Sequence, residues 1–421
     1  MSATTLRVMV FGERGAGKTL YLAGLFRGMS VSGPGSVFTL QTGEVDRLKL
    51  NRIYADAVNP LLKNFPPSTH WQTEPWRFDC QITNRHGTFR PLSVEYLDYS
   101  GEMLDPLDAR LGMTDEEIEV DPELRALRGY RDHADAYLLM IDGLKLLRML
   151  RGAPELAGWL EHYLSDQLQV MEQRLTGTGG RPPLHVVVSK WDLLDGRMVD
   201  GVPVTLGAVA GLVARQPTFA AHLDGRAQDR DAPVRVIPVS VTGPFAALDE
   251  ETGEIVKVPG RPVQPYNLDV PFTALLPDTI RWRREQLLAD TGPSGEGVER
   301  KLNRRAALLA HARAFVGSAR GPLAERLDRW ATRRQNGGSP AMSIATAGLA
   351  GELLHQLGAV LDEQESRSRA RLREIQEEHQ RRRQAVATES EAITLALQGF
   401  AVRLAEFEEK NPGSLLGEVL S

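Results

Sequence analysis

Residues 6–19 read LRVMVFGERGAGKT, and this stretch decides the fold. Its first six residues form an apolar run broken only by Arg7, which predicts a strand buried inside a sheet. A glycine-rich turn follows, and Leu20–Met29 then predict a helix. A strand that passes through a tight turn into a helix is typical of the beginning of an α/β domain.

The turn itself, Gly12–Thr19 (GERGAGKT), fits the pattern G-x-x-x-x-G-K-[ST]. Its glycines allow the backbone to wrap around phosphate groups with the N–H groups pointing inward. Lys18 can reach the β- and γ-phosphates of a nucleotide, and the hydroxyl of Thr19 can ligate Mg²⁺. We therefore predict that the whole loop binds nucleotide phosphates, through Gly12, Glu13, Arg14, Gly15, Ala16, Gly17, Lys18 and Thr19.

A second motif, Asp98–Gly101 (DYSG), follows the predicted strand Val94–Leu97. A carboxylate at the end of a strand can hold Mg²⁺ through water, and the backbone N–H of Gly101 can bond the γ-phosphate. The pattern D-x-x-G is weak when it stands alone. Behind a phosphate loop at this spacing, it predicts a metal site that includes Asp98.

A third motif, Ser189–Asp192 (SKWD), follows the apolar run Leu184–Val188. The carboxylate of Asp192 can accept hydrogen bonds from both N1–H and N2–H₂ of guanine, whereas adenine offers no such pair of donors. The stem of Lys190 can lie along the plane of the base. This loop therefore predicts a guanine site formed by Ser189, Lys190 and Asp192.

The three motifs occur in the order and strand context of Ras-like and translation-factor-class GTPases, which the chain resembles over roughly residues 5–290. Val239–Thr242 (VSVT) resembles the last nucleotide-binding motif of that class, in which the backbone at Ser240 and Val241 contacts the guanine oxygen. The resemblance implies a doubly wound, mostly parallel sheet that binds GTP or GDP with Mg²⁺.

More narrowly, the chain resembles the bacterial double-GTPase families that are tied to predicted conflict and signalling systems. The resemblance lies in Phe65–Thr69 (FPPST), in the sequence LDYSGE at residues 97–102, and in the passage from Asn267 to Pro271. The motifs occur once in this chain, so any second GTPase would be a partner protein.

Several positions depart from the motifs of the class. Ser189 stands where Asn or Thr is usual, which weakens the expected preference for guanine. Thr69 is our choice for the switch threonine that closes over Mg²⁺ and the γ-phosphate, with Thr73 as the second choice. Glu102 stands where Ras-like enzymes place a glutamine that orients the attacking water, and it can act as a base if its pKa is raised. Arg14 replaces a small glycine, so it either crowds the attacking water or stabilises the transition state as an arginine finger does.

Nearly continuous apolar runs predict further buried strands at Ala136–Ile141, Leu184–Val188 and Val234–Val239, and Leu156–Leu175 predicts a helix. Alternating strands and helices indicate an α/β fold with a doubly wound sheet. Residues 247–258 predict a small inserted hairpin and Asn267–Asp290 a helix. We place the P-loop GTPase domain at residues 1–292.

Residues 293–421 are rich in Ala, Arg, Glu, Gln and Leu, and they predict an all-α extension. Its expected helices are Glu299–Arg334, Ala341–Gln384 and Thr388–Lys410. Part of the extension has heptad-like spacing, which predicts a weak or solvated coiled coil at Leu372, Ile375, His379, Arg382 and Val386.

The composition of the chain limits the classes of protein to which it can belong. The chain has 421 residues, 42% of them hydrophobic and 25% charged, which is ordinary for a soluble protein of more than one domain. Its formal net charge of −5 does not predict a nucleic-acid partner. We find neither a membrane span nor a signal peptide in the sequence, so we expect a cytoplasmic protein. Its single cysteine, Cys80, excludes an intramolecular disulfide.

The leading interpretation is a GTP-binding switch with slow hydrolysis. In it, Lys18, Arg14, Thr69 and Glu102 serve the reaction, and the switch loops and C-terminal helices contact a protein effector or regulator. Self-association into a homo-oligomer is possible in this interpretation. Three alternatives remain open, namely a pseudo-GTPase scaffold that keeps its nucleotide, a dynamin-like membrane GTPase, and a P-loop ATPase of another class.

Overall fold

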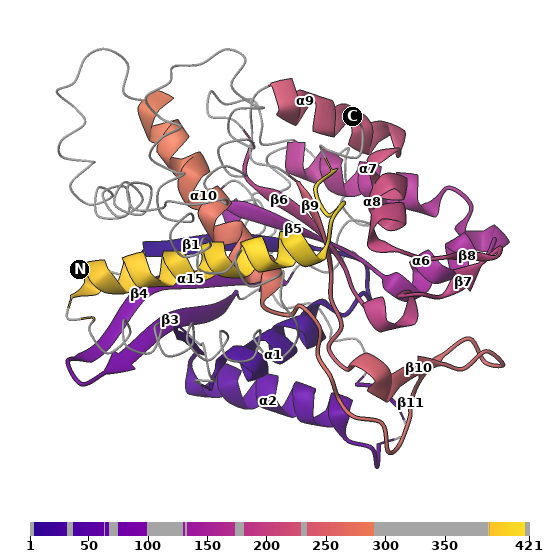
Figure 1. Cartoon of the computed structure of the whole chain (residues 1–421), viewed down its shortest axis with the longest axis horizontal. Coiled ribbons are helices and arrows are strands. Elements are labelled where there is room, and N and C mark those ends of the chain that lie inside the picture. Colours follow the sequence, from indigo (N-terminus) through magenta and orange to yellow (C-terminus); the bar gives the residue numbers. More distant parts are fainter. Residues whose placement is uncertain are drawn as a thin grey trace, which may run out of the picture.

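The computed structural model describes residues 4–31, 37–62, 64–66, 75–98, 129–130, 133–172, 181–228, 234–289, 386 and 388–416. These residues form a seven-stranded sheet with the strand order β2-β3-β4-β1-β5-β6-β9 and helices on both of its faces (Figure 1). The strands are β1 Thr4–Phe11, β2 Thr39–Gln41, β3 Trp76–Asn84, β4 Gly87–Asp98, β5 Ala136–Ile141, β6 Leu184–Val188 and β9 Arg235–Pro238.

The sheet is mostly parallel, as the sequence predicts. Strands β4, β1, β5, β6 and β9 pair in parallel, whereas β3 is antiparallel to β4 and β2 is antiparallel to β3. Four expected strands are present at β1, β5, β6 and β9, and the expected strand at Val94–Leu97 is the end of the longer β4. The α/β class is therefore confirmed.

Alternate residues of the central strands face two separate apolar cores. In β1, Leu6, Val8 and Val10 belong to one core, while Met9 and Phe11 belong to the other. This alternation follows from the period of two residues in a strand, and it explains why the central runs are apolar throughout. Each face then requires its own cover of helices.

The helices divide between the two faces. The first core contains residues of α1 (Lys18–Met29), α10 (Val270–Ala289) and α15 (Glu389–Lys410). The second core contains residues of the remaining large helices, which are α6 Gly143–Leu150, α7 Trp159–Glu172, α8 Leu206–Ala214 and α9 Pro217–Gln228.

The smaller elements surround this frame. Helix α2 (Glu44–Val58) packs against α1 and buries only Leu50 and Ala57. An antiparallel hairpin of β10 (Ala246–Leu248) and β11 (Ile255–Lys257) lies where the sequence predicts one. The remaining short elements are β7 Met198–Val199, β8 Val202–Pro203, and the 3-10 helices η2 Pro154–Leu156, η3 Trp191–Leu193 and η4 Gly243–Phe245.

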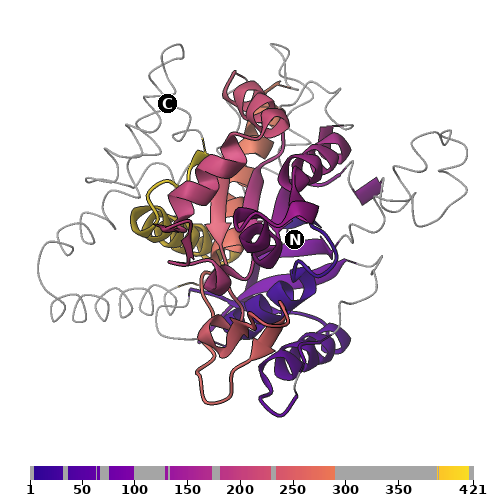
Figure 2. The same cartoon turned by 90° about the vertical axis from the view of Figure 1, so that its right-hand side faces the viewer.

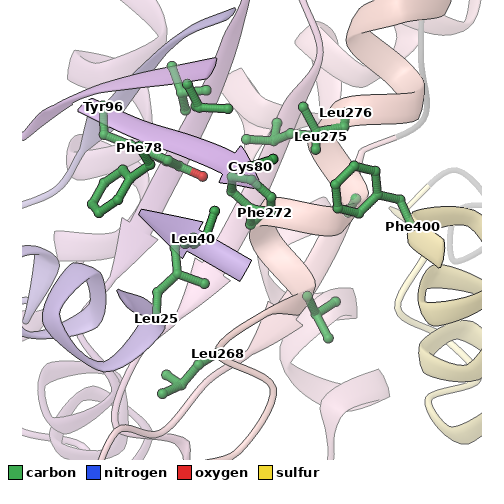
Figure 3. Close-up of a cluster of buried hydrophobic side chains, with 14 of the residues drawn as sticks. Leu25, Leu40, Phe78, Cys80, Tyr96, Leu268, Phe272, Leu275, Leu276 and Phe400 are labelled. Carbon is green, nitrogen blue, oxygen red and sulfur yellow. The ribbon is translucent and has the colours of Figure 1, made fainter. Parts of the chain in front are cut away.

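Helix α15 occupies the same core as the sheet, although it comes almost at the end of the chain. In both views it lies beside α10 (Figure 1, Figure 2). Phe400 of α15 makes an edge-to-face contact with Phe38, with ring centroids 4.8 Å apart, and it lies 5.8 Å from Phe272 of α10. Figure 3 shows Phe400 pointing toward Phe272 and the core behind it. Thr388 begins the helix with a capping box that includes Glu391.

The C-terminal segment after α15 pairs with the edge strand of the sheet. Leu415 forms an antiparallel bridge with Arg235 of β9, and the N–H of Leu416 donates to the carbonyl of Val234 at 3.0 Å. The buried guanidinium of Arg235 contacts Asp278 of α10 at 2.6 Å and Glu408 of α15 at 2.7 Å. Charged groups and backbone pairing therefore join β9, α10 and α15.

These contacts bear on two expectations about the C-terminal region. Helix α15 buries one face in the first core of the sheet domain rather than in a separate unit, and the predicted division at residue 292 falls in a part of the chain outside the described residues. Val386, which we had placed on the coiled-coil stripe, is buried in the first core, and its carbonyl accepts a hydrogen bond from Asn84 at 2.8 Å. The other residues of that stripe and the two helices expected before it also lie outside the described part.

Two further expectations concern Cys80 and membrane spans. Cys80 is fully buried among the apolar side chains of β3 and its neighbours, and burial raises the pKa of its thiol. Within the described ranges, every helix is too short or too polar to cross a membrane.

Candidate functional site

Three of the predicted motif loops meet at one edge of the sheet. The loops that follow β1, β6 and β9 all leave the carboxyl ends of parallel strands, which is where open α/β sheets bind ligands. A cavity of about 730 Å³ lies there. Its lining includes motif residues Arg14, Gly15, Ala16, Gly17, Lys18, Thr19, Ser189, Lys190, Asp192 and Val241.

The glycine loop has backbone angles that its sequence requires. Gly15 and Gly17 have φ values of 81° and 89°, in the left-handed region where a side chain is strained. Gly12 is needed for a different reason, because a Cβ there would lie 3.0 Å from the carbonyl oxygen of Met140 on β5. Helix α1 then begins directly after Gly17, which has no side chain that could cap the helix. A helix N-terminus without a side-chain cap is suited to binding an anionic group such as phosphate.

Lys18 is buried within this loop, with only 7% of its surface exposed. Its ammonium donates hydrogen bonds to the carbonyl oxygens of Gly12 at 2.7 Å and Glu13 at 3.1 Å. A buried ammonium is costly unless polar groups surround it. The two carbonyls meet part of this requirement and hold the charge at the wall of the cavity.

The structure brings only part of the expected metal site together. Thr19 lines the cavity, and Asp98, the last residue of β4, is in register with Val10 of the adjacent β1. The register brings the backbone of Asp98 to the same sheet edge as the glycine loop. Of the described residues, no group of three or more His, Cys, Asp and Glu side chains is arranged to hold a metal ion. Thr69, Thr73, Gly101 and Glu102 lie outside the described part of the chain.

The loop after β6 is held by its neighbours on β5 and α6. The buried Ser189 donates from both its N–H (3.0 Å) and its hydroxyl (3.2 Å) to the carbonyl of Ile141. Lys190 has a left-handed φ of 52°, and its ammonium lies 2.8 and 2.9 Å from the two carboxylate oxygens of Asp142. Asp142 also caps α6 by accepting from the N–H of Leu144 at 2.9 Å. The pair fixes the stem of Lys190 at the cavity wall.

Asp192 and the last motif meet directly. Asp192 is half-buried, and burial raises the pKa of its carboxyl group, while a hydrogen bond from Ser240 opposes that shift. Ser240 is itself buried, and its hydroxyl oxygen accepts from the N–H of Gly243 at 2.8 Å. The loop after β9 therefore positions the carboxylate that we assigned to guanine. Ser240 donates a hydrogen bond to this carboxylate, and Val241 lines the cavity.

A polar cluster beside the glycine loop was missed in the sequence. The carboxylate of Glu13 accepts from the ammonium of Lys145 at 2.9 Å and from the indole N–H of Trp159 at 3.0 Å. Lys145 also lies 5.7 Å from the centroid of the Trp159 ring, within range of a cation–π interaction. The carboxylate within the glycine loop is thus paired with an ammonium. A signal was present, since Lys145 comes four residues after the buried strand β5 in a chain poor in lysine.

Two walls of the cavity were also missed. One is formed by α2 and the chain after it, and it contributes Lys49, Arg52, Ile53, Phe65 and Pro66. The other is the hairpin of β10 and β11, which contributes Ala246, Gly253, Glu254 and Ile255. Phe65 and Pro66 belong to the stretch that carries the double-GTPase resemblance, but the sequence alone does not place these two residues, α2 or the hairpin at the nucleotide site. Trp76 of β3 is 2% exposed and also lines the cavity.

Comparison with known proteins does not identify the function of this chain. The chain matches no protein-family profile and no curated protein. Among solved structures it is similar to a chain of the "Signal recognition particle receptor SRb-GTP/SRX complex from Chaetomium thermophilum". That similarity has a TM-score of 0.30 and 18% sequence identity, and it covers 57% of this chain and 93% of the other. At this TM-score it carries no argument, so the function is inferred from the geometry of the site.

Proposed function

We propose that this protein binds guanine nucleotides and hydrolyses GTP slowly. One observation carries the proposal: a single cavity is lined by the glycine loop with Lys18 at one side and by the Ser189–Asp192 loop at another. A loop for phosphates and a carboxylate for the base are the two parts that recognition of a guanine nucleotide requires.

The surroundings of Asp192 support guanine as the base. Its carboxylate already accepts a hydrogen bond from Ser240, and its pKa is raised by burial. Two N–H donors from guanine would stabilise the ionised form and lower that pKa, whereas adenine would leave the carboxylate without them. Lys190 is fixed beside Asp192 by Asp142, where its stem can cover one face of the base.

Mg²⁺ fits the residues that are available. Thr19 offers a hydroxyl, and Asp98 and Thr69 are the other proposed ligands, the metal otherwise being held by phosphate and water. When bound, the metal would neutralise charge on the phosphates during transfer to water. The protein residues Lys18 and Arg14 add positive charge beside it, and Glu102 is the proposed residue that faces the attacking water.

We further infer a switch that acts on protein partners. Contacts of Thr69 and residues 98–102 with the γ-phosphate and Mg²⁺ would order these segments, and hydrolysis would release them. A second GTPase is one proposed partner, on the strength of the double-GTPase resemblance.

Calorimetry with Mg²⁺ tests the proposal directly. We expect GTP and GDP to bind and ATP to bind at least about 100-fold more weakly, as two lost hydrogen bonds to a carboxylate allow. Equal affinity for ATP and GTP would reject the guanine assignment. Single-turnover hydrolysis then separates a slow enzyme from a nucleotide-holding scaffold, because turnover that disappears with Lys18→Ala would exclude the scaffold.

A further inference from the structure

The hairpin of β10 and β11 forms a wall of the cavity beside the base loop. Its register pairs Ala246 with Lys257 and Leu248 with Ile255, and its turn is closed by Asp249, whose carboxylate accepts from the N–H of Glu251 at 3.0 Å. The hairpin lies next to the end of α2 (Figure 1). The hairpin therefore borders the cavity at the place where α2 ends.

Lys257 joins the base of this hairpin to α2. Its ammonium donates to the carbonyl of Asp56 at 2.6 Å and to the carbonyl of Asn59 at 3.1 Å, and the residue is only 8% exposed. Both carbonyls belong to the C-terminal end of α2, where the last carbonyls have no partner within the helix. A cation at this end also interacts favourably with the helix dipole. The contact thus satisfies two groups that the helix cannot satisfy itself.

The same ammonium lies 5.2 Å from the centroid of the Phe65 ring, within range of a cation–π interaction. Phe65 lines the cavity and lies on the connection from α2 to β3, four residues before Thr69. Lys257 belongs to the hairpin, which forms one wall of the cavity, and it bonds to α2, which forms the other wall. Asp56 and Lys257, which join the two walls, are 201 residues apart in the sequence.

A second contact of the hairpin is exposed and serves for comparison. Glu250, at the turn, lies 2.7 Å from Arg151 and 3.6 Å from Arg197, and all three side chains are open to solvent to a third or more. Exposed ion pairs contribute little and are screened by salt. The buried contact of Lys257 is accordingly the stronger of the two attachments.

We propose that Lys257 clasps the β10–β11 hairpin to the C-terminal end of α2 and to Phe65, and that opening of this clasp governs the release of a guanine nucleotide from the cavity. The clasp rests on the proposed function, since it needs a nucleotide to retain. It gives Lys257 a positioning role, because the residue acts on the walls of the cavity and lies outside its lining.

The test measures dissociation of a fluorescent GDP analogue from the full chain by stopped flow, with Mg²⁺ present. We expect Lys257→Met to raise the dissociation rate about tenfold, which corresponds to about 1.4 kcal/mol, and to change the association rate less. Lys257→Arg keeps a cation that can bond helix carbonyls, so it should restore much of the slow release. Glu250→Gln is the matched control on the same hairpin, and it should stay within about twofold of the wild type.

A second readout needs no nucleotide. In Lys257→Met, amide hydrogen exchange at the end of α2 and in the hairpin should be faster, while exchange in β1 and β5 stays at the wild-type rate. If Lys257→Met does not fold, Phe65→Leu keeps an apolar side chain, removes the ring, and should raise the dissociation rate in the same direction.

Two outcomes would overturn the clasp alone: a folded Lys257→Met with wild-type dissociation, or a Glu250→Gln that releases nucleotide as fast as Lys257→Met. A wild-type protein that binds no guanine nucleotide would overturn the proposed function, and the clasp with it.

Discussion

Lys18 contributes both hydrogen bonds and a positive charge to the candidate site. Its ammonium is buried and bonded to two carbonyls of its own loop, so the loop and the charge depend on each other. When phosphate is present, the same ammonium can bond to it with little movement. The positive charge of the proposed phosphate site is thus already in place in the fold.

We expect Lys18→Ala to abolish measurable GTP binding or hydrolysis, because the loop loses the cation that bonds the β- and γ-phosphates. Calorimetry and single-turnover assays measure the two effects. Lys410→Ala, which removes an exposed lysine at the end of α15, is the control and should bind GTP normally. Wild-type affinity in Lys18→Ala would contradict the phosphate assignment.

In the proposed nucleotide site, Asp192 is the residue that recognises the base. Asp192→Asn keeps the shape of the side chain, but it replaces a charged acceptor pair by one acceptor and one donor. We expect affinity for GDP to fall about 10- to 100-fold while weak ATP binding changes little, since a hydrogen bond to a charged group contributes about 1.5–3 kcal/mol. Competition between GDP and ATP for one labelled nucleotide measures the ratio. An unchanged ratio would remove Asp192 from the base site.

Among the elements, the buried parallel strands are those that the sequence predicts well. β1, β5 and β6 are continuous apolar runs, because both of their faces are covered. β3 was not predicted, although its alternating apolar and polar residues (WRFDCQITN) are a strand signal, whereas α2 was not predicted because it buries only two side chains. The three motif loops were predictable because short patterns carry them. The walls formed by α2 and the hairpin were not, since their contact joins residues about 200 positions apart.

Helix α15 illustrates a different limit of sequence reasoning. Its buried stripe of Ala392, Leu395, Ala396, Phe400 and Phe407 has the helical period, so the helix itself is predictable. The same stripe would suit a separate helical bundle equally well. Only tertiary packing decides that this helix covers the sheet.

Packing of α15 yields a prediction at the same scale. Phe400→Ala should lower the free energy of unfolding by about 3–5 kcal/mol, since it removes a fully buried ring in contact with Phe38 and Phe272. Urea unfolding followed by fluorescence measures the loss. Glu409→Ala, on the exposed side of the same helix, should stay within about 0.5 kcal/mol of the wild type. A similar small effect for Phe400→Ala would mean that α15 is not part of the core.

At the scale of the whole molecule, one ionic cluster joins three elements and makes stability depend on pH. Burial acts to raise the pKa of Asp278, but Arg235 and His185 outweigh it and hold that pKa at about 2. Burial lowers the pKa of His185. The ionised carboxylate of Asp278 thus balances the charge of Arg235 inside the fold.

A carboxyl group whose pKa is lowered by folding stabilises the protein above its unfolded pKa and loses that contribution as pH falls through the folded pKa. For Asp278 this interval runs from about pH 4 down to about pH 2. We expect Asp278→Asn to be less stable than the wild type at pH 7, and the difference to shrink as pH falls toward 2. Urea unfolding at pH 7, 4 and 3 measures this trend, and a difference independent of pH would contradict it.

The path of the chain has a consequence for how the domain is held together. Helix α10 ends at Ala289, and the chain is back in the core at Val386, so the stretch between them is anchored to one domain at both ends. A single cut within that stretch would leave two fragments, with α15 held by non-covalent contacts such as those of Phe400 with Phe38 and Phe272 and of Glu408 with Arg235. We expect two separately produced fragments, residues 1–289 and 386–421, to associate through these contacts, and their association would report on the sheet and its last helix without any nucleotide.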